Sequence, residues 1–280
     1  MKTYCLALAL AALPGVLLAQ DAPAGFATRN QLTVGPTLGN RKVKDLQASP
    51  LMYVANPAGL QLTYAHISER SRFRAEVQAG TSSFTAPALG PRTYIFTDEK
   101  ITGETTRSTL VLAPDLYQGS VQISYLRRVN TANPANKWRS FAGLSLHDQV
   151  SYADGVAMTT WALNSATLNL ALAGEWHLRP AHVLTLQGAV PLVGLVSRLP
   201  YSNVLSYPER SYAHLFFSQG TRLATWNRLQ RLQLQVGYEA QLSPHFGLGL
   251  QYQVEWFHYS RPRSITSLSN QGNLQVIYHF

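Results

Sequence analysis

The sequence predicts an all-β fold, a closed antiparallel up-and-down transmembrane β-barrel of about ten strands. Three observations predict it. Several segments alternate apolar and polar residues over about ten positions, the length of a tilted strand that crosses a bilayer. Short and long connections follow one another in turn along the chain. The last segment keeps the alternation up to an aromatic final residue, Phe280.

The alternation is clearest in residues 229–241 and 246–256, where leucine, valine, tyrosine and tryptophan share one face and glutamine, glycine and arginine share the other. Successive side chains of a strand point to opposite faces, so each segment has one apolar and one polar face. The strands of a soluble sandwich also alternate but tend to be shorter. We therefore expect the apolar faces to meet lipid and the polar faces to line the lumen. Further segments with this pattern are 73–79, 117–128 and 167–178.

The connections set the strand number and the orientation. Short connections are predicted at 69–71, 130–137, 179–182 and 243–245. Long ones are predicted at 39–58, 86–115, 153–164, 199–226 and 261–271. Bacterial barrels have short periplasmic turns, longer extracellular loops and an even number of strands, so both chain ends fall on the periplasmic side.

One long connection contains two further candidate strands, residues 92–97 and 105–112. Both are shorter than the roughly nine residues that a membrane strand needs, so we expect them to lie above the membrane as part of a loop. A barrel of about twelve strands is the alternative. Aromatic residues near the ends of the segments predict two interfacial belts. They are Trp138, Trp176, Phe246 and Tyr278 near the short turns, and Tyr152, Trp226 and Trp256 near the long loops.

The first residues have the pattern of a secretory signal peptide. Lys2 precedes an apolar run at 6–18, which is too short to span a bilayer and ends in small-residue cleavage chemistry at Ala19. We expect residues 1–19 to be removed and residues 20–280 to form a single barrel domain. Cys5 is the only cysteine, so the mature chain would hold no disulfide and no thiolate metal site.

The C-terminal segment 273–280 places Leu274, Val276, Tyr278 and Phe280 on one face. It resembles the C-terminal signature of bacterial outer-membrane barrels, which the barrel-assembly machinery reads. The resemblance implies that Val276, Tyr278 and Phe280 form an assembly signature, that this machinery is a partner, and that the protein resides in the outer membrane. The chain as a whole is similar to uncharacterised outer-membrane proteins of Bacteroidota.

The formal net charge of +9 comes mostly from arginine. Nucleic-acid binding is not expected, because the basic residues form no cluster on one element and the chain has an export signal. Arginines and acids on the polar faces instead predict a paired network inside the lumen. Its predicted members are Arg74, Glu76, Arg128, Arg139, Glu175, His177, Arg231, Glu239 and Glu255.

Other arginines fall in the predicted long loops: Arg198, Arg210, Arg222, Arg261 and Arg263. There they could meet the phosphates of outer-membrane lipid and lipopolysaccharide, or simply be solvated.

Two His-x-Ser pairs are candidate catalytic groups, His66 with Ser68 and His258 with Ser260. Residues i and i+2 of a strand share a face, so an imidazole could activate the hydroxyl. This spacing resembles that of some outer-membrane lipid esterases, which implies ester hydrolysis at the outer rim. Alternation points His258 and Ser260 outward, and His66 lies at the opposite end. Outer-membrane proteases also have barrels of about ten strands, with acidic residues and a histidine at the rim. A resemblance to them would imply other catalytic candidates: Asp98, Glu99, His147, Asp148 and Asp154.

Residues 56–60, Asn-Pro-Ala-Gly-Leu, resemble a motif of the long-chain fatty-acid transporter family, which implies transport of hydrophobic compounds. The same residues also suit a turn that leads into a strand. The eight histidines have no metal-ligand spacing and no glycine-rich phosphate loop precedes a helix, so no metal and no cofactor is expected.

Barrel size restricts the function. Open aqueous channels need roughly 16 to 18 strands, whereas small barrels are filled by their own side chains. We therefore predict a non-enzymatic outer-membrane protein whose surface loops bind a partner, a glycan or a lipid, with the loop ligand unknown. A narrow channel for a solute or hydrophobic compound is the first alternative, and a His258/Ser260 rim esterase is the second.

Overall fold

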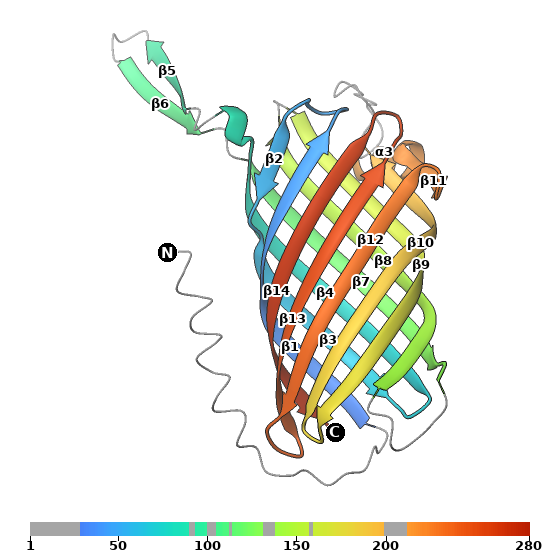
Figure 1. Ribbon diagram of the computed structural model, residues 1–280. Helices are drawn as coiled ribbons and strands as arrows, with labels where there is room; N and C mark the ends of the chain where they lie inside the picture. Colours follow the sequence, from blue (N-terminus) through green and yellow to red (C-terminus); the bar gives the residue numbers. More distant parts are fainter. Residues whose placement is uncertain are drawn as a thin grey trace.

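The computed structural model describes residues 29–89, 93–99, 105–111, 114–130, 138–156, 159–198 and 212–280. The predicted signal peptide at residues 1–19 lies outside these ranges. Almost all described residues are in strands (Figure 1). The strands are β1 (Arg29–Asp45), β2 (Met52–Ala55), β3 (Ala58–Ile67), β4 (Ser71–Thr85), β5 (Thr93–Glu99), β6 (Thr105–Val111), β7 (Asp115–Arg128), β8 (Trp138–Val156), β9 (Thr159–Arg179), β10 (His182–Arg198), β11 (Thr221–Thr225), β12 (Leu229–Gln241), β13 (Phe246–Tyr259) and β14 (Ile265–His279). The helical segments are η1 (Pro87–Leu89) and α3 (Tyr212–Gly220).

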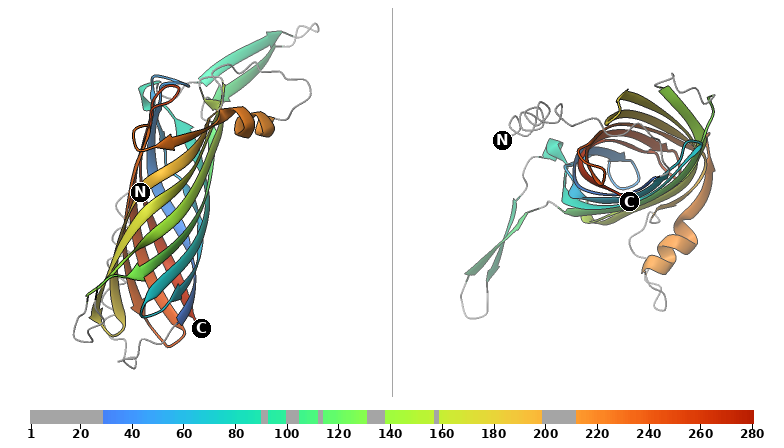
Figure 2. Two further views of the ribbon diagram at one scale, coloured as in Figure 1. Left: turned by 90° about the vertical axis from the view of Figure 1, so that its right-hand side faces the viewer. Right: turned by 90° about the horizontal axis from the view of Figure 1, so that it is seen from below.

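The strands close into an antiparallel barrel of ten, as the sequence predicted. The first and last strands complete the ring, with Leu32 of β1 opposite Tyr278 of β14. Two of the ten strands are interrupted. β2 and β3 pair in succession along β1, and β11 and β12 pair in succession along β10. Figure 2 shows the closed ring of tilted strands from below.

The interruption between β2 and β3 falls at Asn56 and Pro57. The amide of Gly39 in β1 donates to the carbonyl oxygen of Pro57 at 2.9 Å, which keeps the two strands joined across the break. At Gly59 the neighbouring backbone comes so close that an added Cβ would lie 2.1 Å from the carbonyl oxygen of Ala79. The Asn-Pro-Ala-Gly-Leu segment therefore has a structural use here: it ends one strand and starts the next.

The two further candidate strands do not enter the barrel. β5 and β6 pair only with each other, in a separate two-stranded sheet. Figures 1 and 2 show this hairpin projecting from the end of the barrel that carries the long connections. The placement above the barrel is confirmed, and the alternative of about twelve barrel strands is wrong.

Three predicted long loops are instead largely strand. β1 continues to Asp45, β14 begins at Ile265, and only residues 157–158 separate β8 from β9. Beyond Leu38 the outward residues of β1 become polar, at Lys42 and Lys44, so the apolar alternation disappears from the sequence. The backbone pairing continues because β14 still accepts and donates the hydrogen bonds of β1. The strands therefore extend past the apolar band.

The outer face of the barrel is apolar. The C-terminus lies at the end with the short connections (Figure 1). Large apolar side chains such as Leu172, Leu234 and Leu250 are exposed there. Trp138 and Trp176 are exposed near the short turns, as interfacial belts require. Among the described helices, none has the length and apolar character needed to cross a bilayer.

Candidate functional site

An apolar layer crosses the lumen near the long connections. Its buried members are Val43, Tyr53, Ala55, Phe84, Ala86, Leu116, Ala153, Trp161, Leu163, Val196, Ala224, Leu229, Phe257, Tyr259 and Ile265. All ten strands of the barrel contribute to it, counting each interrupted strand once. No member is more than 8% exposed. Water in an open lumen would wet these inward side chains, so their burial shows that the barrel is closed at this level.

Aromatic contacts and a buried ion pair hold this apolar layer together. The ring centroid of Phe84 lies 5.1 Å from that of Tyr53 and 5.4 Å from that of Trp161. The indole nitrogen of Trp161 donates to Oδ2 of Asp45 at 2.8 Å. Oδ1 of Asp45 pairs with the guanidinium of Arg198. The pairing of Asp45 with Arg198 neutralises two buried charges at the boundary between the apolar layer and the rim.

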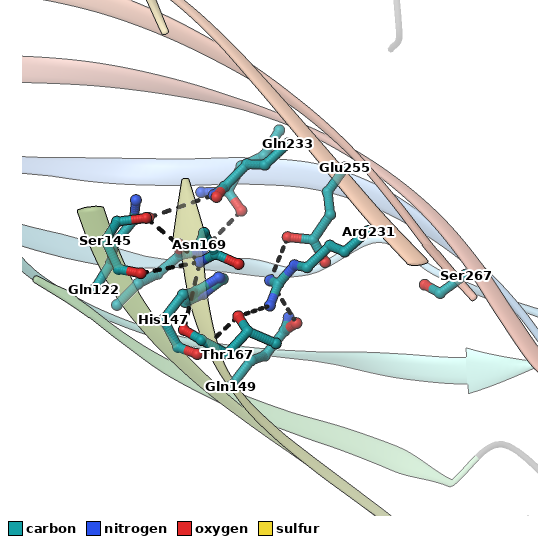
Figure 3. Close-up of polar contacts among 12 residues, drawn as sticks. Gln122, Ser145, His147, Gln149, Thr167, Asn169, Arg231, Gln233, Glu255 and Ser267 are labelled. Atoms are coloured by element: carbon teal, nitrogen blue, oxygen red, sulfur yellow. Dashed lines mark hydrogen bonds and ion pairs between the residues drawn. The ribbon is translucent and has the colours of Figure 1, made fainter. Parts of the chain in front are cut away.

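A polar layer occupies the lumen next to the apolar layer, and Figure 3 shows its contacts around Arg231. Arg231 is 2% exposed, and its Nη2 donates to Oε2 of Glu255 at 2.6 Å. The same guanidinium reaches Gln149 at 3.4 Å and Thr167 at 3.5 Å, so it joins β12 to β8 and β9 across the lumen. Figure 3 shows these side chains converging from opposite walls.

Arg41 crosses the lumen in the same layer. Its Nη1 donates to Oγ of Ser151 at 2.8 Å, and its Nε donates to Oγ of Ser267 at 3.2 Å. Arg41 therefore ties β1 to β8 and β14. The cavity beside these groups has a volume of about 40 Å³, room for very few water molecules.

A second set of ion pairs occupies the end with the short turns. Arg72 pairs with Glu175, and Arg29 Nη2 lies 3.3 Å from Oε1 of Glu239. The guanidinium of Arg72 also lies over the ring of Phe141, 5.3 Å from its centroid. The cavity at this level has a volume of about 100 Å³.

Seven of the nine predicted lumen residues lie in these layers. Glu255 and Arg231 meet in the middle layer, Arg74 Nη2 lies 2.5 Å from Oε2 of Glu76, and Glu239 lies at the short-turn end. His177 Nε2 lies 4.0 Å from Oε2 of Glu175.

Two predicted members lie at the edge of the network. Arg128 Nη1 is 3.8 Å from Oε1 of the exposed Glu69, next to the β3–β4 turn. Arg139 lies opposite Glu175 in the β8–β9 pairing.

Sequence reasoning missed five charged members: Arg29, Arg41, Asp45, Arg72 and Arg198. For Arg41 and Asp45 a signal was present. The inward positions of β1 continue every second residue from Gln31 and Thr33 through Thr37 to both of them. The assignment of residues 39–58 to a loop obscured this continuation.

An arginine-rich pocket lies at the rim above the apolar layer. It is lined by Arg198, Arg222, Arg228 and Arg261 together with Tyr259 and five further residues, and its volume is about 600 Å³. It lies between the α3–β11 corner and the β13–β14 connection. Arg198 Nη1 donates to the carbonyl oxygens of Arg261 at 2.9 Å and Arg263 at 2.6 Å, which holds that connection in place.

The four arginines of the arginine-rich pocket all act electrostatically on the hydroxyl of Tyr259. Tyr259 is the last residue of β13 and lies beyond the apolar band on the outside of the barrel. Burial raises the pKa of the Tyr259 hydroxyl, and Arg198, Arg228, Arg222 and Arg261 each act to lower this pKa. A field of this sign favours a negative charge in the pocket.

The candidate catalytic pairs are placed as follows. Nδ1 of His258 lies 3.0 Å from Oγ1 of Thr266, and its ring stacks on Trp256. Ser260 follows the end of β13, where its amide donates to the carbonyl oxygen of Arg228. At the other end, Nδ1 of His66 lies 2.9 Å from Oδ1 of Asn30.

The protease-like candidates do not form a pair. His147 faces the lumen and is buried, whereas Asp148 is exposed and accepts a hydrogen bond from Asn164 at 2.7 Å. Successive residues of a strand point to opposite faces, which separates them. The side chains of Asp98, Glu99 and Asp154 lie outside the described part of the structure. Within that part, no three histidine, cysteine or acidic residues gather closely enough to hold a metal ion.

The fold is that of small bacterial outer-membrane β-barrels. The outer-membrane protease OmpT of Escherichia coli superimposes with a TM-score of 0.50 at 8% sequence identity, over 93% of this chain and 99% of that one. The translocator domain of the autotransporter NalP of Neisseria meningitidis gives 0.41 at 13% identity, over 99% and 98% of the two chains. Ail, the attachment invasion locus protein of Yersinia pestis, gives 0.33 at 12%, over 90% and 99%. No protein-family model and no curated protein matches the sequence.

Proposed function

We propose that this protein is a non-conducting barrel of the bacterial outer membrane that acts as a binding protein at its extracellular rim. The observation that carries the proposal is the buried apolar layer to which every barrel strand contributes. A solute would have to displace packed aromatic rings there. Beneath the layer it would have to break buried ion pairs, which costs several kcal/mol when one partner is left alone.

Because the lumen is closed in this proposal, a ligand would bind at the rim. Its pocket of about 600 Å³ is several times larger than the lumen cavities of about 100 and 40 Å³. Ligand sites are commonly clefts of about 300 to 1,000 Å³, and among these three cavities the rim pocket alone falls in that range. The arginines that line it favour an anionic ligand over a neutral one.

The same proposal places the protein in the outer membrane. It also names the barrel-assembly machinery and lipopolysaccharide as its partners. Support comes from the apolar outer face, the fold, and the exposed side chains of Val276 and Tyr278 in β14 and of Phe280 directly after it. The His258/Ser260 pair receives no role in it, because the imidazole of His258 is engaged by the hydroxyl of Thr266.

The test is conductance. Purified wild-type protein inserted in a planar lipid bilayer should show no steady current, while a general porin in the same bilayer reports that insertion and recording work. Insertion of this protein is verified separately, by co-flotation with liposomes and by a folded band that shifts on heating. Steady single-channel steps from verified insertions would contradict the proposal and favour a narrow channel.

A further inference from the structure

We infer that the arginine-rich pocket is a binding site for the phosphate-bearing headgroup of a glycolipid in the outer leaflet of the membrane. The inference rests on the proposed function, because it names the ligand of the rim. Two independent features carry it: the balance of charge within the pocket, and the apolar surface beside it.

The charge balance favours a ligand with phosphate groups. Four arginines line the pocket, and among its described lining residues none is acidic. Arg198 is buried, and its charge is matched by Asp45 just below. Arg222, Arg228 and Arg261 are exposed. Like charges gathered in one pocket repel each other, and an anion bound between them removes that cost.

The geometry of the guanidinium group specifies the type of anion. Arginine presents paired N–H donors that match two oxygens of one phosphate group, and such charge-assisted bonds are stronger than neutral ones. The pocket is also lined by Gln47, Gln219 and Tyr259, whose polar groups suit the hydroxyls of a sugar. Its volume of about 600 Å³ exceeds what a single phosphate needs, so a phosphorylated sugar fits better.

The apolar surface beside the pocket indicates that the ligand comes from the membrane. Leu223 lines the pocket and is 64% exposed, and it lies opposite the exposed Leu195 on β10. Phe217 of α3 and Trp226 after β11 are each 53% exposed. Figure 2 shows α3 outside the ring of strands, at the end with the long connections. A tryptophan at this height is typical of the membrane interface. A bound glycolipid could thus place its phosphate in the pocket and its acyl chains against the outer wall.

The test compares lipid binding by wild-type protein and two double variants in neutral detergent. The pocket variant is Arg222→Gln with Arg228→Gln. The matched control is Arg127→Gln with Arg179→Gln, which removes the same charge from exposed sites at the short-turn end. The probes are diphosphorylated lipid A, the same lipid without phosphates, and inorganic pyrophosphate. A heat-dependent shift in electrophoresis shows that each variant keeps its barrel.

We expect the wild type and the control to bind diphosphorylated lipid A at least about tenfold more tightly than the pocket variant, since charge-assisted hydrogen bonds are lost. Arg222→Lys with Arg228→Lys should recover part of the affinity, because the charge returns without the paired donors. Equal binding by the pocket variant and the control would overturn the site. Equal binding of the dephosphorylated lipid would overturn phosphate recognition. Pyrophosphate that binds as tightly as the lipid would overturn the membrane source.

These outcomes are separate from those of the conductance test. Steady conductance with intact, phosphate-dependent lipid binding would contradict the proposed non-conducting role and leave the pocket assigned. Absence of conductance together with no lipid binding would contradict the pocket assignment alone.

Discussion

Trp161 donates its indole hydrogen to Asp45, a residue 116 positions earlier in the chain, at a distance of 2.8 Å. The contact joins β9 to β1 through the apolar layer of the lumen. Asp45 also pairs with Arg198, which in turn binds the carbonyl oxygens of the β13–β14 connection. One carboxylate thus links the apolar layer below it to the arginine-rich pocket above it.

Replacement of Asp45 by alanine should destabilise the barrel strongly. The change leaves the buried charge of Arg198 without its carboxylate, which typically costs about 3–5 kcal/mol. Urea unfolding in lipid vesicles measures the loss in the free energy of unfolding. Lys44→Ala, at the exposed neighbouring position, is the matched control and should cost far less. Equal losses in the two variants would mean that the pair contributes nothing.

Arg231 and Glu255 should behave as a coupled pair. Arg231→Met alone leaves the Glu255 carboxylate buried and should cost about 3–5 kcal/mol. The double variant Arg231→Met with Glu255→Leu should cost clearly less than the sum of the two single variants, because no unpaired charge remains. The free energies of unfolding of all four proteins form a double-mutant cycle. Strict additivity would argue against the pairing.

Gly59 should not tolerate a side chain. A Cβ at this position would lie 2.1 Å from the carbonyl oxygen of Ala79, so Gly59→Ala must separate β3 from β4. Gly119→Ala is the control, since the nearest atom to its Cβ would be 3.6 Å away. The folded fraction after refolding into vesicles, read from the heat-dependent band shift, should fall for Gly59→Ala only. A fully folded Gly59→Ala protein would disprove the close approach.

Phe280→Ala should lower the amount of assembled barrel in the outer membrane. The resemblance of residues 273–280 to an assembly signature motivates this prediction, and the exposed side chain of Phe280 is available for recognition. Leu268→Ala removes an exposed apolar side chain from β14, the strand that Phe280 follows, but outside the signature, and serves as the control. Immunoblots of outer-membrane fractions quantify the two variants. Wild-type amounts of Phe280→Ala protein would exclude a role for the terminal aromatic residue.

Much of the barrel could be predicted from local patterns. In residues 229–241 the alternation alone separated the inward Arg231 from the outward Leu232, and the structure agrees. The short connections at one end of the barrel were also readable, because Pro180 and Pro244 interrupt the pattern. The prediction failed above the apolar band. There Lys42 and Lys44 replace apolar outward residues, so a paired strand has the composition of a loop.

The sequence by itself determined the face on which each side chain lies, because the period of two is a property of the strand and needs no partner. It also predicted about ten barrel strands, because short and long connections alternate along the chain, whereas the alternative of about twelve was excluded only when β5 and β6 were found to pair with each other alone. Only the tertiary structure decided which inward residues meet. The tilt and stagger of the closed strands place Asp45 beside Trp161 and Arg198, and bring Arg198, Arg222, Arg228 and Arg261 around one pocket. That stagger is a property of the whole ring, so no single segment of the sequence carries it.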